Sequence, residues 1–205
     1  MLHFLVAHTL LAMLESISIS EQIPQKQGYF IYVYADFHIP RVNLFAQENS
    51  WLKMTPYYQK KENSDEMKYI GSMEEARPLW TSFLGFLNET LNWSYWTGRN
   101  FPWITERHLR YTCDIISASQ AVFHSKFPDS EFVVWVHPME RPMDLFVKKC
   151  LKQKNVTVLD QRDNINFNDS HRIPRDGHPT ARANELMADI LWQELKNIPI
   201  KLKNN

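Results

Sequence analysis

Three short runs of β-branched and aromatic residues constrain the fold of this chain more than any other feature. Residues 28–33 read GYFIYV, residues 131–136 read EFVVWV, and residues 155–159 read NVTVL. Apolar side chains occupy both the odd and the even positions of each run instead of alternating with polar ones, which is typical of strands buried on both faces. We therefore predict a parallel sheet that is covered by helices on its two sides.

Segments with a helical period lie between and after these runs. Residues 105–127 and 180–196 each place apolar side chains along one side of a predicted helix. A third helix is predicted from apolar residues at i, i+3, i+4, i+7 and i+8, namely Met143, Phe146, Val147, Cys150 and Leu151. Strand and helix thus alternate, which indicates an α/β sandwich with a parallel sheet and right-handed crossovers.

Residues 42–104 interrupt this alternation, and we predict that they form an insertion beyond the first strand. Residues 57–61 and 67–70 flank a polar turn and indicate a hairpin, whereas residues 80–91 have a helical pattern. A chain of 205 residues is long enough for one domain with its own core. We therefore expect a single domain over residues 1–205, with the insertion at about 42–104.

The mostly apolar residues 2–14 have two interpretations. The segment is shorter than the roughly 20 residues that a typical membrane-spanning helix needs, so we do not expect a transmembrane protein. A buried or amphipathic helix is the main expectation. A signal peptide is the alternative, although a basic n-region and an A-x-A site are both missing. The compartment therefore stays open between the cytoplasm and the cell envelope or exterior.

Composition excludes several classes of function. The chain has 23 basic and 23 acidic residues, and this balance argues against a general nucleic-acid binder. Only five glycines are present, and neither GxGxxG nor GxxxxGKS/T occurs, so we expect no glycine-rich phosphate loop. Cys113 and Cys150 lie on the apolar sides of predicted helices, and we expect both to be small core residues.

Ionisable residues follow the predicted strands, at the edge where parallel α/β sheets bind their ligands. Asp36, His38 and Arg41 come after the first run, and His137 directly follows the second. These four residues are candidates for binding a substrate. Two further interpretations stay open: a metal site built on Asp36 and His38 together with Asp176 and His178, and a polar hydrogen-bonded cluster of Asp36, His38 and Arg41 at the strand end.

Asp176 and His178 form the sharpest candidate pair, because they come directly before the last predicted helix. A carboxylate beside an imidazole orients the ring and stabilises its protonated form, which makes the histidine a general base. The structural alternative is that Asp176 caps the helix and Pro179 occupies its first turn. The short D-x-H pattern leaves both interpretations open.

Residues 176–195, DGHPTARANELMADILWQEL, resemble the last motif block of the SGNH (GDSL-type) hydrolases. Residues 28–42, GYFIYVYADFHIPRV, resemble the central strand of one branch of that family, and HTLLAMLES resembles the helix before it. The resemblance implies a three-layer sandwich with a flavodoxin-like parallel sheet. It also implies hydrolysis or transfer of the acyl group of a small ester or an acylated sugar or lipid, with no cofactor, His178 as the base and Asp176 as its orienting group.

The chain departs from this family in its nucleophile. Family members open with a strand that ends in G-D-S, whereas no G-D-S occurs here, and Asp129 and Ser130 precede a strand instead of following one. We therefore expect a truncated family domain that lacks the first two strands and is inactive alone. Residues 29–34 then form a bare apolar sheet edge. The alternative is a non-catalytic scaffold that binds a protein partner at this edge.

Overall fold

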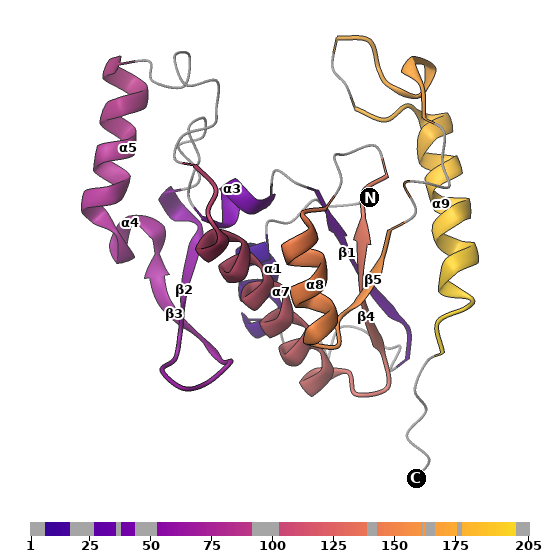
Figure 1. The fold of residues 1–205 in the computed structure, drawn as a ribbon, viewed down its shortest axis with the longest axis horizontal. Coiled ribbons are helices and arrows are strands. Elements are labelled where there is room, and N and C mark those ends of the chain that lie inside the picture. The colour runs from indigo at the N-terminus through magenta and orange to yellow at the C-terminus, as the bar shows by residue number, and fades with distance from the viewer. Residues whose placement is uncertain are drawn as a thin grey trace.

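The computed structural model describes residues 7–16, 27–35, 38–43, 53–91, 103–138, 143–160, 162, 167–175 and 178–199. Within them, three parallel strands form one sheet with the order β1–β4–β5 (Figure 1). These strands are β1 (Tyr29–Tyr34), β4 (Glu131–Val136) and β5 (Thr157–Leu159). The predicted parallel sheet is confirmed. β1 lies at its edge and has β4 as its neighbour among the described strands.

The third run forms a shorter strand than its sequence predicts. β5 begins at Thr157, because Asn155 has a φ angle of 57° and lies in the turn that ends α8 (Leu145–Gln153). Asparagine tolerates this left-handed conformation better than most residues, so it ends a helix readily. The first two residues of the run therefore belong to the end of a helix, which a pattern of apolar residues does not reveal.

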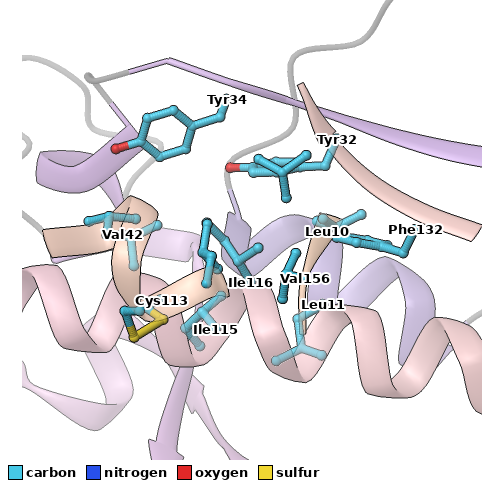
Figure 2. Packing of buried hydrophobic residues seen from close by; sticks show 14 of the residues in the cluster. Leu10, Leu11, Tyr32, Tyr34, Val42, Cys113, Ile115, Ile116, Phe132 and Val156 are labelled. Atoms are coloured by element: carbon cyan, nitrogen blue, oxygen red, sulfur yellow. A yellow bond between two sulfur atoms is a disulfide. The ribbon is translucent and has the colours of Figure 1, made fainter. Parts of the chain in front are cut away.

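Helices α1 (Ala7–Ser16), α7 (Glu106–Lys126) and α8 pack against one face of the sheet (Figures 1 and 2). Even-numbered strand residues point to this face, since successive side chains of a strand alternate between its two faces. The largest fully buried side chains of this core are Tyr34, Tyr58, Phe132, Leu10, Leu11, Leu14, Ile115, Ile116, Met143 and Leu151.

The helix α9 (Ala181–Leu195) covers the opposite face of the sheet. A second buried cluster joins Val33 and Trp135 of the strands to Ala183 and Met187 of this helix. The sheet therefore lies between two layers of helices, as an α/β sandwich. This architecture is the part of the predicted fold that the structure confirms.

The described part of the insertion is a hairpin followed by two helices. Its elements are β2 (Pro56–Lys60), β3 (Met67–Ser72), α4 (Met73–Ala76) and α5 (Pro78–Leu91). β2 and β3 pair antiparallel, as the sequence predicts. The predicted helix begins two residues early, at Pro78, because proline suits the first turn of a helix. The Tyr58 hydroxyl donates to Glu15 Oε2 over 2.7 Å and so joins the hairpin to α1.

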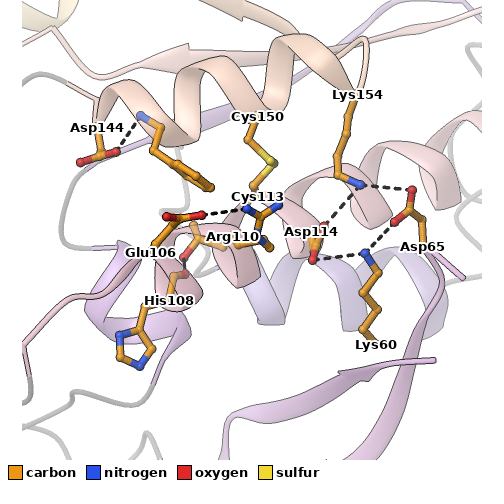
Figure 3. The surroundings of a disulfide bond; sticks show 12 residues. Lys60, Asp65, Glu106, His108, Arg110, Cys113, Asp114, Asp144, Cys150 and Lys154 are labelled. Atoms are coloured by element: carbon orange, nitrogen blue, oxygen red, sulfur yellow. Dashed lines mark hydrogen bonds and ion pairs between the residues drawn. A yellow bond between two sulfur atoms is a disulfide. The ribbon is translucent and has the colours of Figure 1, made fainter. Parts of the chain in front are cut away.

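Cys113 and Cys150 are both buried in the core, as predicted, and they also form a disulfide that our sequence reasoning missed (Figure 3). Cys113 lies on α7 and Cys150 on α8, with their Cα atoms 6.3 Å apart and both side chains buried. The apolar period correctly places each cysteine on the inner side of its helix. It does not reveal that the two helices meet at these positions, because their contact is a feature of the tertiary structure.

The structure describes only the later part of the N-terminal apolar segment. Residues 7–14 lie in α1, as the helix interpretation predicts, whereas residues 2–6 lie outside the described residues. No helix in the described part of the chain is long and apolar enough to cross a membrane.

Candidate functional site

His38 begins α3 (His38–Val42), just beyond the carboxyl end of β1. Its side chain is fully buried. The His38 Nδ1 atom accepts a hydrogen bond from the Ala35 N–H over 3.4 Å and lies 2.8 Å from the Tyr32 hydroxyl oxygen. A backbone N–H only donates, so Nδ1 is an acceptor and the proton of the neutral ring is on Nε2.

The environment of His38 keeps its ring neutral at physiological pH. Burial is the main cause that lowers the pKa of His38 to about 3, and the charges of Arg41 and His137 add to it. The contacts of Nδ1 with Tyr32 and Ala35 make this ring part of a hydrogen-bonded polar cluster at the strand end. Its predicted neighbour Asp36 lies outside the described residues. Within the described ranges, no group of three or more His, Cys, Asp or Glu residues is arranged to hold a metal ion.

His137 follows β4 and lies beside the end of β1. Its backbone N–H donates to the Tyr34 carbonyl over 2.8 Å, and its ring centroid is 6.5 Å from that of Trp135. The side chain is buried. Burial first, and then the charge of Arg172, lowers the pKa of His137 to about 4. Two neutral imidazoles, those of His38 and His137, therefore lie at the same edge of the sheet.

The loop that precedes α9 is folded back on itself. Arg172 and Pro179 form an isolated antiparallel bridge, and the Ile173 N–H donates to the His178 carbonyl over 2.8 Å. Pro179 therefore lies in this bridge, and its predicted place in the first turn of the helix is wrong. The His178 side chain is exposed, and its predicted neighbour Asp176 lies outside the described residues.

Thr180 is the N-cap of α9. Its side-chain oxygen accepts a hydrogen bond from the Ala183 N–H over 3.3 Å. Its backbone N–H donates to the His171 carbonyl over 3.0 Å, at the end of the short 3₁₀ helix η3 (Asp169–His171). The alternative in which Asp176 caps this helix is therefore wrong, because a nearer residue with a good capping side chain takes the position.

The carboxyl edge of the sheet thus combines two kinds of histidine. His38 and His137 are buried and neutral, whereas His178 is exposed on the loop that also contains Arg172. The exposed His178 ring is accessible to a bound substrate, so His178 is the candidate general base. Our sequence reasoning missed Tyr32 and Arg172. Tyr32 is detectable as a tyrosine near a strand end, but the irregular sequence around Arg172 carries no comparable signal.

A second place with functional geometry lies between the hairpin and the start of α7. A pocket of about 160 Å³ opens there. Its lining residues come from α3 and the residue after it, from β2, from the start of α5 with the residue before it, and from α7. They are Val42, Asn43, Tyr57, Arg77, Trp80, Arg107, His108 and Tyr111.

The charge of this pocket is positive. The Arg77 guanidinium lies over the Tyr57 ring, 5.2 Å from its centroid. Burial is the main cause that lowers the pKa of His108, and the nearby charges of Arg107 and Arg77 add to it. Among the described residues, no carboxylate forms an ion pair with Arg77 or Arg107. Two guanidinium groups therefore point to an anion as the natural ligand class.

No family model, curated protein or solved structure matches this chain. Function therefore has to be inferred from the residues and their geometry. Two places in the described part of the chain supply that geometry: the carboxyl edge that includes His178, and the pocket that includes Arg77 and Arg107.

Proposed function

We propose that this chain is a relative of the SGNH ester hydrolases that binds a small ester, or an acylated sugar or lipid, at the carboxyl edge of its sheet. One observation carries the proposal. The exposed His178 comes directly before the helix that covers one face of a parallel sheet, on the loop that also holds Arg172 near His137. Parallel α/β sheets bind their ligands at this edge.

In this proposal His178 moves the proton of an acyl-transfer reaction, and Asp176 orients its ring. The buried histidines supply neutral hydrogen-bonding groups behind the bound ester. Asp36 and Arg41 complete the set of predicted substrate-binding residues, together with these two histidines, His38 and His137.

Under this proposal, the chain alone does not hydrolyse esters. Attack on an ester carbonyl needs a hydroxyl group whose proton the histidine accepts. The sequence has no G-D-S to supply it. Ester cleavage at this edge therefore requires a nucleophile from outside these 205 residues, and these residues alone bind the ester without cleaving it.

Labelling with a serine-reactive fluorophosphonate tests this part of the proposal. The unmodified chain and His178→Ala are treated side by side, and His124→Ala on α7 serves as a control. We expect no stoichiometric adduct by intact mass spectrometry in any of the three proteins. An adduct that forms in the unmodified chain and in His124→Ala, but not in His178→Ala, would show that an activated nucleophile is present.

A second candidate function, non-catalytic binding of a small anion, is favoured by the arginine pocket. Arg77 and Arg107 supply guanidinium donors without carboxylate partners among the described residues, and Trp80 and Tyr57 supply aromatic faces. Planar guanidinium groups bind phosphate and sulfate with paired hydrogen bonds, and aromatic faces pack against sugar rings. A sugar that carries a phosphate or sulfate group matches both features.

Titration calorimetry with glucose 6-phosphate, glucose 6-sulfate and glucose tests this second candidate. We expect the two charged sugars to bind more tightly than glucose. The change Arg77→Gln with Arg107→Gln should weaken their binding at least about tenfold, since a charge-assisted hydrogen bond contributes about 1.5–3 kcal/mol. Arg182→Gln, at an exposed position of α9, is the matched control. Equal binding by the double variant and the control rules out the pocket.

A further inference from the structure

The turn between α8 and β5 presents an exposed asparagine amide. The Asn155 N–H donates to the Lys152 carbonyl over 3.0 Å, and the Val156 N–H donates to the Leu151 carbonyl over 2.9 Å. These two bonds form the Schellman cap of α8 and fix the backbone of Asn155. Its carbonyl accepts a hydrogen bond from Gln120 Nε2 over 3.1 Å. Its side-chain amide has no hydrogen-bond partner in the described part of the chain.

Asn155 is the first residue of an Asn-Val-Thr sequence, which is an acceptor pattern for N-glycosylation. The residues that follow it are fixed: Val156 is 4% exposed and packs in the core, and Thr157 begins β5. Asn155 itself is exposed. A sugar on its amide therefore extends into solvent and displaces neither the core nor the helix cap.

The Cys113–Cys150 disulfide is an independent observation that leads to the same compartment. It contains both cysteines of the chain and joins α7 to α8, the helix that Asn155 ends (Figure 3). Disulfides form and persist in oxidising environments such as the lumen of the endoplasmic reticulum and the cell exterior, and are rare in the cytosol. N-glycosylation is typical of proteins that pass through that lumen.

We propose that this chain folds in the oxidising lumen of a secretory pathway and carries an N-linked glycan on Asn155. The glycan donor is an oligosaccharide attached to a polyprenyl pyrophosphate. A bond forms between Asn155 Nδ2 and the anomeric carbon, the bond from that carbon to the pyrophosphate oxygen breaks, and a base of the transferring enzyme takes one Nδ2 proton. The disulfide forms as Cys113 and Cys150 lose two electrons and two protons to the disulfide of an oxidoreductase.

Three other acceptor patterns begin at Asn88, Asn92 and Asn168. The side chains of Asn88 and Asn92 lie outside the described residues. The Asn168 Oδ1 atom accepts from the Ser170 N–H over 3.0 Å and from the Ser170 hydroxyl over 2.6 Å, and lies 2.8 Å from His171 Nδ1. Its amide is thus engaged in a local turn, which makes Asn155 the better acceptor and Asn168 a suitable comparison.

The experiment is to produce the full chain behind a cleavable secretion signal in eukaryotic cells. Peptide mass spectrometry after enzymatic removal of N-glycans identifies a glycosylated asparagine by its conversion to aspartate. Thr157→Val breaks the acceptor pattern while keeping Asn155 and a β-branched residue in the strand. Asn155→Asp removes the amide and still tolerates the left-handed backbone, and Asn168→Asp is the control. Thiol alkylation with and without reductant measures the disulfide.

We expect Asn155 to be recovered as aspartate from the unmodified chain and from Asn168→Asp, and to be recovered unconverted from Thr157→Val. Asn155→Asp should be secreted and should show no glycan at this position. In every variant both cysteines should react with the alkylating reagent only after reduction. Unconverted Asn155 in the secreted unmodified chain overturns the proposal. So does a chain that stays in the cell with two reactive thiols.

Discussion

His38 and His137 show how single residues at the carboxyl edge of the sheet depend on their surroundings. Both are buried, and burial is the main reason why their pKa values fall to about 3 and about 4 from an ordinary value of 6.5. The sequence predicts their place beyond strand ends, because His137 directly follows one buried run and His38 comes shortly after the other. It does not predict their burial, which depends on α3 and on the loop that holds Arg172.

These two histidines make the stability of the fold depend on pH. Below pH 6.5 the unfolded chain binds protons that the folded chain excludes, so the free energy of unfolding falls as the pH drops from about 6.5 towards 4.5. Above pH 6.5 they contribute no pH dependence. One pKa unit corresponds to about 1.4 kcal/mol, and the unfolded histidine is only half protonated at pH 6.5, so each histidine accounts for about 2 kcal/mol over this interval.

Urea unfolding at pH 4.5, 5.5, 6.5 and 7.5 measures this effect. His38→Gln keeps a hydrogen-bond acceptor but does not titrate, so it should lose part of the pH dependence even if it is less stable at pH 7.5. His178→Gln, at an exposed position, should retain the full dependence. A His38→Gln variant whose stability falls as steeply as that of the unmodified chain contradicts the buried neutral histidine.

For helices and strands, the repeat of apolar residues along the sequence predicts most elements but few of the contacts between them. The runs at 28–33 and 131–136 become β1 and β4, because a strand covered on both faces needs apolar residues at every position. The apolar pattern of α7 or of α8 does not show that these two helices pack together, so the sequence does not predict the disulfide between them. The apolar period also does not identify the N-cap of α9, which is Thr180 and not the alternative Asp176.

The disulfide should stabilise the packing of α7 on α8. It closes a loop of 37 residues, for which the chain-entropy model gives about 4 kcal/mol. We expect Cys150→Ala to lower the urea midpoint, and we expect reductant to lower the midpoint of the unmodified chain to a similar level. Cys113→Ala with Cys150→Ala controls for the buried free thiol. An unmodified chain whose midpoint does not respond to reductant contradicts a disulfide between these helices.

The edge position of β1 predicts an alternating pattern of hydrogen exchange. The Glu131 N–H donates to the Gly28 carbonyl, and the His137 N–H donates to the Tyr34 carbonyl. The backbone N–H and C=O groups of the even-numbered residues of β1 therefore point toward β4. The amides of Phe30, Tyr32 and Tyr34 should therefore exchange slowly, and those of Ile31 and Val33 faster. Uniform slow exchange along the strand in the isolated chain shows that another strand already covers this edge. A partner that adds a strand should slow Ile31 and Val33 only when it binds.

At the scale of the whole molecule, the α/β sandwich and the described hairpin follow from patterns in the sequence, whereas the candidate site follows only in part. The predicted strands and helices indicate where three histidines lie: His38 and His137 follow strands, and His178 precedes the last helix. Arg172 joins them because its loop folds back through the bridge to Pro179. Such an irregular segment has no period, so its position could not be read from the sequence.

The three-layer arrangement predicts where α9 tolerates a larger side chain. Ala183 is fully buried against the cluster of Val33 and Trp135, whereas Ala188 on the same helix is exposed. We expect Ala183→Leu to lower the free energy of unfolding by about 1–3 kcal/mol, since a close-packed core resists added volume. Ala188→Leu should change it by less than about 0.5 kcal/mol. Equal effects of the two changes contradict the packing of α9 on the sheet.

NMR of the histidine rings shows whether an ester binds next to His178. Glucose acetylated at O6 is titrated into the chain, with unmodified glucose as the control and His178→Ala used to assign the resonance. We expect the His178 ring signals to shift with the acetylated sugar and not with glucose, while the ester stays intact. His178 signals that do not move with the ester contradict binding at this site.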